Sequence, residues 1–274
     1  MNIRPSLATT CNPAVIRDDT QMKQTNSEWL RTVIGKQNAE GSLLLIGGCR
    51  LTDFRVRIAQ SQVRRDLLPS FWSHVAIINN KEKNGGAYRL YEISLEPKNG
   101  FGVVPKNNAV QEGVSSTYDD QTRYPNIAWL KFPVSPSVLQ RDTTVKKSRT
   151  KKTAAAKTLR EAIDENVDQF RKRRGLLDMP AMVTEWLAFA WGVSDRTNPI
   201  VKSIGVPSAV FVEAIYAMLG IELTPGLATQ SSCPEAIWQA ALWWQDFYAS
   251  SASLTSASPS GQYMIRQPEA AARE

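Results

Sequence analysis

The chain changes character between Pro133 and Pro136, and this change limits its fold more than any other feature of the sequence. Upstream, short apolar runs bounded by glycine and other turn residues are typical of strands. Downstream, apolar residues recur at the three- and four-residue spacing of amphipathic helices. A block of strands followed by a block of helices indicates an α+β domain. The sequence therefore predicts a small antiparallel β-sheet packed against helices.

About five strands are expected within residues 42 to 132. They lie in GSLLLIGG (41–48), LLPSFWSHVAIINN (67–80), AYRLYEISL (87–95), GFGVVP (100–105) and NIAWLKF (126–132). The turn KEKNGG (81–86) predicts that the second and third strands pair as a hairpin. Short connections between successive strands favour an antiparallel meander.

Five helices are expected from apolar spacing and end signals. The first runs from Ser27, as its cap, to Ile34, and segment 50–68 is too irregular to assign. An amphipathic helix carries Leu159, Ile163, Val167 and Phe170, and Asp178 caps the next one. The last two cover Ser208–Leu219 and Pro234 to about Tyr248.

These patterns predict one domain with two tails. Residues 1–25 are expected to form a flexible arm, residues 26–249 the folded domain, and the Ser-, Ala- and Pro-rich residues 250–274 a disordered tail. A basic helical insertion is expected at about 136–175. Between 141 and 175 there are 12 Lys and Arg against 5 Asp and Glu, which accounts for the whole net charge of +7.

That basic segment is either a solvated insertion or a patch for phosphates or another anionic surface. No aromatic residues interleave with its cations, so nucleic acid is not expected as a partner. No apolar run is long enough for a secretory signal or a membrane span. We expect a protein made in the cytoplasm, whose export, if it occurs, needs no cleaved leader.

The chain has three cysteines, Cys11, Cys49 and Cys233, and one histidine, His74. An odd, unpaired cysteine set with a single histidine predicts neither a disulfide framework nor a metal site, and no organic cofactor is implied. Histidine exchanges protons near neutral pH, so His74, early in a buried strand, is a candidate general base. The structural alternative is a core histidine satisfied by one hydrogen bond.

Three landmarks carry a resemblance: WSHVAII (72–78), YEISLEPKNGFGVV (91–104) and GVPSAVFVEAIYAMLG (205–220). Together with GSLLLIGG they resemble the circularly permuted papain-like hydrolases of the NlpC superfamily. The resemblance implies a permuted papain-like fold in which a histidine on one strand, a polar partner on the next and a cysteine at a later helix start form the catalytic group.

By this resemblance His74 matches the base and Glu92 the orienting carboxylate, with Gly102 and Val103 after it. Phe211 and Val212 match the apolar pair that follows the family's cysteine, which puts Ser208 at the nucleophile position. The serine departs from the family pattern, because a helix dipole lowers a thiol pKa but cannot turn a hydroxyl into an alkoxide. Ser208 is an engineered replacement of cysteine, a native nucleophile activated by His74, or the mark of a pseudoenzyme.

Cys233 is the alternative nucleophile, because it precedes Pro234 at a helix start; its structural alternative is a small buried residue. The expected activity is that of a cysteine-type hydrolase of amide or peptide bonds, with peptidoglycan stem peptides as first substrate and an antibacterial effector as context. A lipid acyl hydrolase or transferase, and an inactive module that binds a peptide, a protein partner or an inhibitor, are the alternatives. A triad predicts contacts of His74 with both Ser208 and Glu92.

Overall fold

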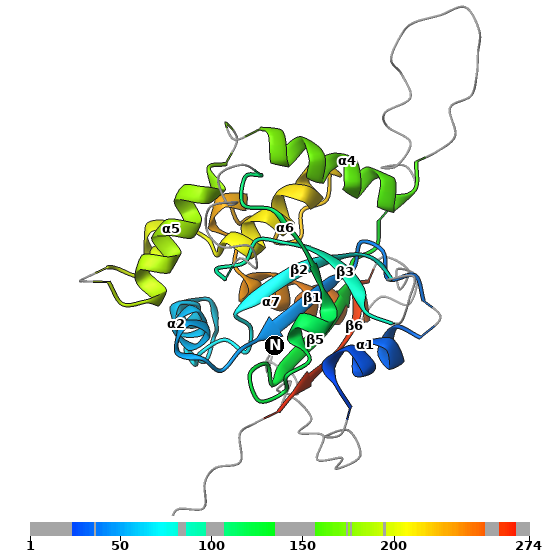
Figure 1. The fold of residues 1–274 in the computed structure, drawn as a ribbon, viewed down its shortest axis with the longest axis horizontal. Coiled ribbons are helices and arrows are strands. Elements are labelled where there is room, and N and C mark those ends of the chain that lie inside the picture. Colours follow the sequence, from blue (N-terminus) through cyan, green and yellow to red (C-terminus); the bar gives the residue numbers. More distant parts are fainter. Residues whose placement is uncertain are drawn as a thin grey trace, which may run out of the picture.

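The structure is a computed structural model that describes residues 24–35, 37–81, 86–96, 107–134, 157–173, 175, 177–193, 196–249 and 258–266. These residues form an α+β fold of six helices and a six-stranded, antiparallel, open sheet (Figure 1). No helix among them is long and apolar enough to cross a membrane.

The sheet has the strand order β4-β3-β2-β1-β5-β6, and every neighbouring pair is antiparallel. The expected meander and the β2–β3 hairpin occupy one half of the sheet, whereas β5 returns beside β1. The strands are β1 (Leu43–Gly47), β2 (His74–Lys81), β3 (Tyr88–Glu92), β4 (Gln111–Val114), β5 (Asn126–Lys131) and β6 (Ser260–Ile265).

One face of the sheet packs against four helices, of which α6 lies against β2 and β3. Leu45, Val75 and Ile77 point to this side and join Phe211 and Ile215 of α6 in the main core. Figure 1 shows α4, α5 and α6 grouped above the sheet and α7 behind it. The four helices are α4 (Leu159–Lys172), α5 (Met179–Ala190), α6 (Pro207–Met218) and α7 (Pro234–Ala249).

The opposite face has a smaller core. Because side chains alternate along a strand, Leu44, Ala76 and Leu90 point to this side, where they meet Leu30 of α1 (Asn26–Ile34). The 3₁₀ helix η4 (Ser115–Tyr118) closes the same face with Tyr118. The sheet is therefore covered on both sides, although unequally.

Helix ends follow the expected chemistry with one correction. The side chain of Asp178 accepts a hydrogen bond from the Ala181 backbone at the start of α5, as predicted. The cap of α1 is Thr25 instead of the predicted Ser27, because Thr25 and Glu28 form a capping box that satisfies two backbone amides. Ser27 does not cap the helix. Its backbone N–H donates to Asp119 Oδ1, and its hydroxyl forms a hydrogen bond with the hydroxyl of Ser115.

The prediction of a disordered tail over 250–274 is wrong at residues 260–265. This segment is β6, which hydrogen-bonds along the whole of β5 and buries Met264 and Ile265. Backbone pairing at a sheet edge depends little on side-chain polarity, so the polar composition of this segment gave no sign that it forms a strand. The folded domain therefore does not end at residue 249.

Two further elements lie where none was assigned: α2 (Leu51–Ala59) in segment 50–68, and β4 at 111–114. Several predictions fall outside the described residues. They are most of the N-terminal arm (1–23), the strand at 100–105 with Gly102 and Val103, the basic stretch 135–156, and tail residues 250–257 and 267–274.

Candidate functional site

His74 is the first residue of β2 and lies opposite Ile46 of β1. Ile46 belongs to the smaller core, so alternation places the His74 side chain on the same face, opposite to α6. Its side chain keeps 14% of its surface exposed, which makes it accessible without being solvated on all sides. The sole histidine of the chain therefore lies at the end of the sheet and on its less covered face.

Glu92, the last residue of β3, contacts His74 as predicted. The distance from His74 Nε2 to Glu92 Oε2 is 3.0 Å, and the Glu92 side chain is only 3% exposed. Continuing the β2–β3 register places Glu92 opposite Ala76, two residues from His74 on the same face. The packing leaves room for the carboxylate only because residue 113 is glycine, where an added Cβ would lie 2.2 Å from Glu92 Oε1.

Tyr118 is a partner of Glu92 that sequence reasoning missed. Its hydroxyl donates a hydrogen bond to Glu92 Oε2 at 2.6 Å, and its ring centroid lies 5.8 Å from that of His74. Burial and the neighbouring Glu92 raise the pKa of Tyr118 well above its ordinary value, so the phenol stays a neutral donor. No local pattern marks Tyr118, because only tertiary structure brings η4 over the end of β3.

This arrangement assigns the roles of the two imidazole nitrogens. An ionised carboxylate only accepts hydrogen bonds, so with Glu92 ionised it is His74 Nε2 that carries the proton of this contact. In the neutral ring Nδ1 is then the basic nitrogen. Within the described part of the chain Nδ1 takes part in no hydrogen bond. His74 is thus oriented by a buried carboxylate and retains one nitrogen able to accept a proton.

His74 and Glu92 line a pocket of about 250 Å³. Its walls come from the loop after β1, the first half of α2, the ends of β2 and β3, η4 and the C-terminal end of α5. One side is charged, where Glu96 pairs with Arg50 and accepts a hydrogen bond from Arg123. The other side is apolar, with Val56, Leu187 and Trp191.

Asp53 adds a second carboxylate to the pocket. Its Oδ1 accepts a hydrogen bond from Ser73 Oγ at 3.1 Å, and its Oδ2 lies 3.5 Å from Arg50 Nε. Burial raises the pKa of Asp53, and Arg50 and Ser73 oppose that rise. A Cβ on Gly48 would lie 2.3 Å from this carboxylate, so the glycine at position 48 makes room for it. In the sequence, the Gly47–Gly48 pair was the signal that other groups pack closely against the backbone at the end of β1.

Ser208 is the second residue of α6 and lies on the other side of the β2 backbone from the His74 ring. Its Oγ accepts a hydrogen bond from Val75 N at 3.4 Å, so the hydroxyl lies next to the peptide group that follows His74. The side chain is buried, does not line the pocket and forms no hydrogen bond with His74 among the described residues. The structure brings Ser208 beside His74 without the direct contact that a triad predicts.

Cys233 is unsuited to act as a nucleophile. It is 1% exposed, does not line the pocket, and burial raises its pKa to about 12. The thiol is therefore neutral near pH 7 and out of reach of a substrate. Cys49 is exposed, and its thiol donates to Thr122 O at 2.8 Å.

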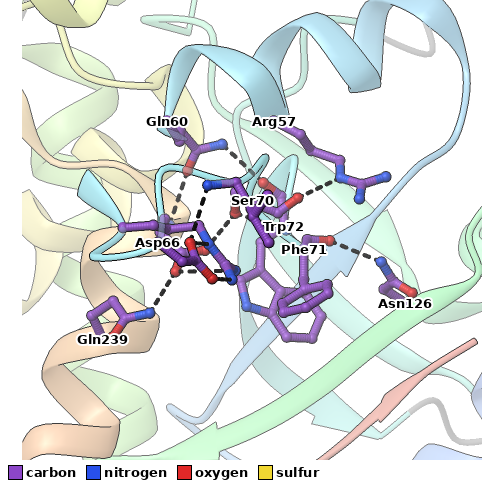
Figure 2. A network of polar contacts seen from close by, with 11 residues as sticks. Arg57, Gln60, Asp66, Ser70, Phe71, Trp72, Asn126 and Gln239 are labelled. Carbon is purple, nitrogen blue, oxygen red and sulfur yellow. Dashed lines mark hydrogen bonds and ion pairs between the residues drawn. The ribbon is translucent and has the colours of Figure 1, made fainter. Parts of the chain in front are cut away.

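A network of polar side chains holds the segment that leads into β2 (Figure 2). Gln60 donates to Trp72 O at 2.8 Å and accepts from Glu235 N at 2.9 Å. Ser70 donates to the fully buried Glu235, and Asn126 donates to Phe71 O. These bonds tie residues 70–72 to α2, α7 and β5, so His74 follows a segment that is fixed on three sides.

No group of three or more His, Cys, Asp or Glu side chains in the described residues is arranged to hold a metal ion. Three cations of the basic insertion pair with acids: Lys157 with Glu165, Arg160 with Asp164 and Arg171 with Glu112. Searches with this chain matched no family model, no curated protein and no solved structure.

Proposed function

We propose that this chain is a hydrolase of amide or peptide bonds that works through an acyl-enzyme. His74 would be the general base and acid, Glu92 its orienting partner, and residue 208 the nucleophile position. The observation that carries the proposal is the 3.0 Å contact between His74 Nε2 and Glu92 Oε2 at the wall of a pocket. A buried carboxylate on one imidazole nitrogen is what a base needs to keep the other nitrogen ready for a proton.

In this proposal the nucleophile transfers its proton to His74 Nδ1 as its oxygen or sulfur bonds to the carbonyl carbon. His74 then gives that proton to the leaving amine, and water releases the acyl group by the same route in reverse. Ser208 is suited to the first step in one respect. Its Oγ accepts from Val75 N but donates its own proton in no hydrogen bond of the described residues.

A cysteine at position 208 would strengthen this chemistry. The residue is in the first turn of α6, where the positive end of the helix dipole favours a thiolate. The dipole gives a hydroxyl much less help, since the pKa of the hydroxyl is far higher. We therefore expect the serine form to be slow or inactive and a cysteine form to be the stronger catalyst.

The burial of Ser208 favours a second candidate from a different class. With 2% of its surface exposed and no place in the pocket lining, Ser208 would have to be uncovered before it met a substrate. A pseudoenzyme that uses the pocket to bind a peptide or protein partner has no such requirement. Both candidates leave the substrate class open, with peptidoglycan stem peptides first and acyl lipids as the alternative.

The test compares the natural chain with Ser208→Cys on muropeptides and on acyl esters. The hydrolase proposal expects turnover by Ser208→Cys and a loss of about a thousandfold or more when His74→Ala is added. Glu92→Gln in the same background should reduce kcat with little change in KM.

Ser232→Cys is the matched control, because Ser232 is also a buried serine but, unlike Ser208, its hydroxyl forms no hydrogen bond with β2 in the described residues. Hydrolysis by Ser232→Cys, or activity that survives His74→Ala, would count against the assigned site. An inert Ser208→Cys on both substrate classes, together with saturable muropeptide binding by the natural chain, would favour the binding module.

A further inference from the structure

Large apolar side chains are exposed along one edge of the molecule, next to the pocket. We call this the α2–α5 face. Helix α2 presents a stripe of three such residues, α5 is followed by two more, and the 3₁₀ helix η5 (Pro199–Lys202) adds one. Its members are Leu51, Phe54, Ile58, Trp191, Val193 and Val201, which are 42% to 63% exposed.

Hydrogen bonds join these three elements. Arg55 of α2 donates to Ala190 O at the end of α5, at 2.9 Å. Asn198, just before η5, donates to Ala59 O at the end of α2, also at 2.9 Å. Figure 1 shows α2 and α5 at the same end of the molecule. The exposed apolar residues therefore belong to adjoining elements, although they come from two distant parts of the sequence.

These side chains are not needed to hold α2 in place. Val56 and Ala59 already anchor the helix in the main core, at 2% exposure each. The stripe at residues 51, 54 and 58 points away from that core. A contiguous apolar surface of this kind usually marks an interaction site, whereas single exposed apolar residues are common.

Cations accompany this face. Segments 50–68 and 191–202 contain seven Lys and Arg against three Asp and no Glu. Four of these cations pair with acids that include Glu96, Glu185 and Glu235 from outside the segments, and three form no ion pair among the described residues: Arg55, Arg57 and Arg65. Arg65 is exposed and forms no ion pair among the described residues, and it is followed by exposed Leu67 and Leu68. A second copy of the chain is a poor occupant, because a two-fold interface would place two surfaces of the same sign against each other.

We propose that the α2–α5 face docks peripherally onto an anionic lipid surface. Phe54, Leu51 and Ile58 would enter the boundary between headgroups and acyl chains, and the arginines would lie at the level of the phosphates. Trp191 lines the pocket as well as the face, so docking would bring the pocket mouth to the lipid. This proposal does not rest on the hydrolase chemistry and holds for a binding module equally.

The test is sedimentation of the full chain with vesicles of phosphatidylcholine alone and of phosphatidylcholine with an equal part of phosphatidylglycerol. The triple variant Leu51→Gln, Phe54→Gln and Ile58→Gln removes apolar surface without changing charge. We expect it to bind mixed vesicles about tenfold or more weakly than the natural chain. The natural chain should bind mixed vesicles better than phosphatidylcholine, and less so as salt rises.

Trp243→Gln with Phe247→Gln is the matched control, because these residues form an exposed apolar patch on α7 away from the pocket. This control should bind like the natural chain. Equal binding by the triple variant would overturn the proposal and assign lipid binding to the basic insertion. The absence of vesicle binding, or a dimer that the triple variant dissociates, would overturn it too. If the triple variant melts early, Phe54→Gln alone replaces it in the same comparison.

Discussion

The sheet face beneath α4–α7 carries the main apolar core, whereas the opposite face becomes polar where β2 begins and β3 ends. The first face holds Val75 and Tyr91, and the second holds their sequence neighbours His74 and Glu92. Strand alternation makes this division, since adjacent residues point to opposite sides. Ser208 belongs to α6 on the first face, so the β2 backbone lies between its side chain and the His74 ring.

The same comparison separates two kinds of stabilisation. On the helix-covered face, burial of large apolar groups dominates, and losses scale with the volume removed. On the polar face, a few hydrogen bonds to a buried carboxylate decide the geometry. Removing a large apolar group from the helix-covered face should therefore cost more stability than removing one hydrogen bond from the polar face.

Phe211→Ala should cause the largest loss, about 3 to 5 kcal/mol of unfolding free energy. Phe211 is completely buried between α6 and the sheet and packs edge-on against Phe170. Urea denaturation measures the loss, and Met218→Ala, at an exposed position of the same helix, should lose less than about 1 kcal/mol. Similar losses for both variants would mean that this face is not tightly packed.

Tyr118→Phe should cost about 1.5 to 3 kcal/mol, because it removes a donor from the buried Glu92 carboxylate. Tyr216→Phe is the counterpart on the other face. Its hydroxyl donates to the neutral carbonyl of Gly41, so about 1 kcal/mol is expected. Chemical denaturation of both variants measures the difference, and a larger loss for Tyr216→Phe would reverse the proposed contrast.

Gly113→Ala should cost about 1 to 3 kcal/mol, because the new methyl group would overlap the Glu92 carboxylate. It should also weaken the contact of Glu92 with His74, which the histidine ring resonances would report in NMR. Gly175→Ala is the control, since an added Cβ there meets no atom within 4 Å. An unchanged histidine spectrum in Gly113→Ala would show that Glu92 is not held by this strand contact.

Asp53→Asn should have the smallest effect and should alter pH dependence. The pKa of Asp53 is raised in the fold by burial, so the folded chain holds this proton more tightly than the unfolded chain. Asp53 therefore makes the free energy of unfolding decrease as pH rises from the ordinary aspartate pKa through the raised value.

Asp53→Asn removes the carboxylate, so the fall in unfolding free energy across this pH range should become smaller by about 1 kcal/mol or less. Thermal melts across acidic pH measure this change. Asp120→Asn is a control of opposite sign. Hydrogen bonds from Thr122 lower the pKa of Asp120, which favours the fold above that pKa. A steeper curve for Asp53→Asn than for the natural chain would contradict the assignment.

Local patterns predicted most of the regular elements. Uninterrupted apolar runs marked β1 and β5, and three- and four-residue spacing marked α4 and α6. Helix α2 escaped because its exposed stripe is as apolar as its buried side, which removes the contrast that reveals a helix. β4 and β6 escaped because edge strands depend on backbone pairing more than on side-chain pattern.

The candidate site also contains residues that the sequence identified and residues that it did not. His74 was identifiable as the only histidine, and its pairing with Glu92 was expected from the family resemblance, with the predicted hairpin placing the two residues on neighbouring strands. Tyr118, Asp53 and the pocket were not identifiable, because they come from elements that are distant in sequence. The relation of Ser208 to His74 was not predictable either, since it depends on the face against which α6 packs.

By itself, the sequence determined most of the strands and helices and the β2–β3 hairpin. Each follows from local periodicity and short connections, which act within a few residues. Tertiary structure alone decided that β6 completes the sheet, that Glu92 has Tyr118 as a donor and that Ser208 is buried behind Val75. These outcomes depend on packing between elements far apart in the chain, which no local pattern encodes.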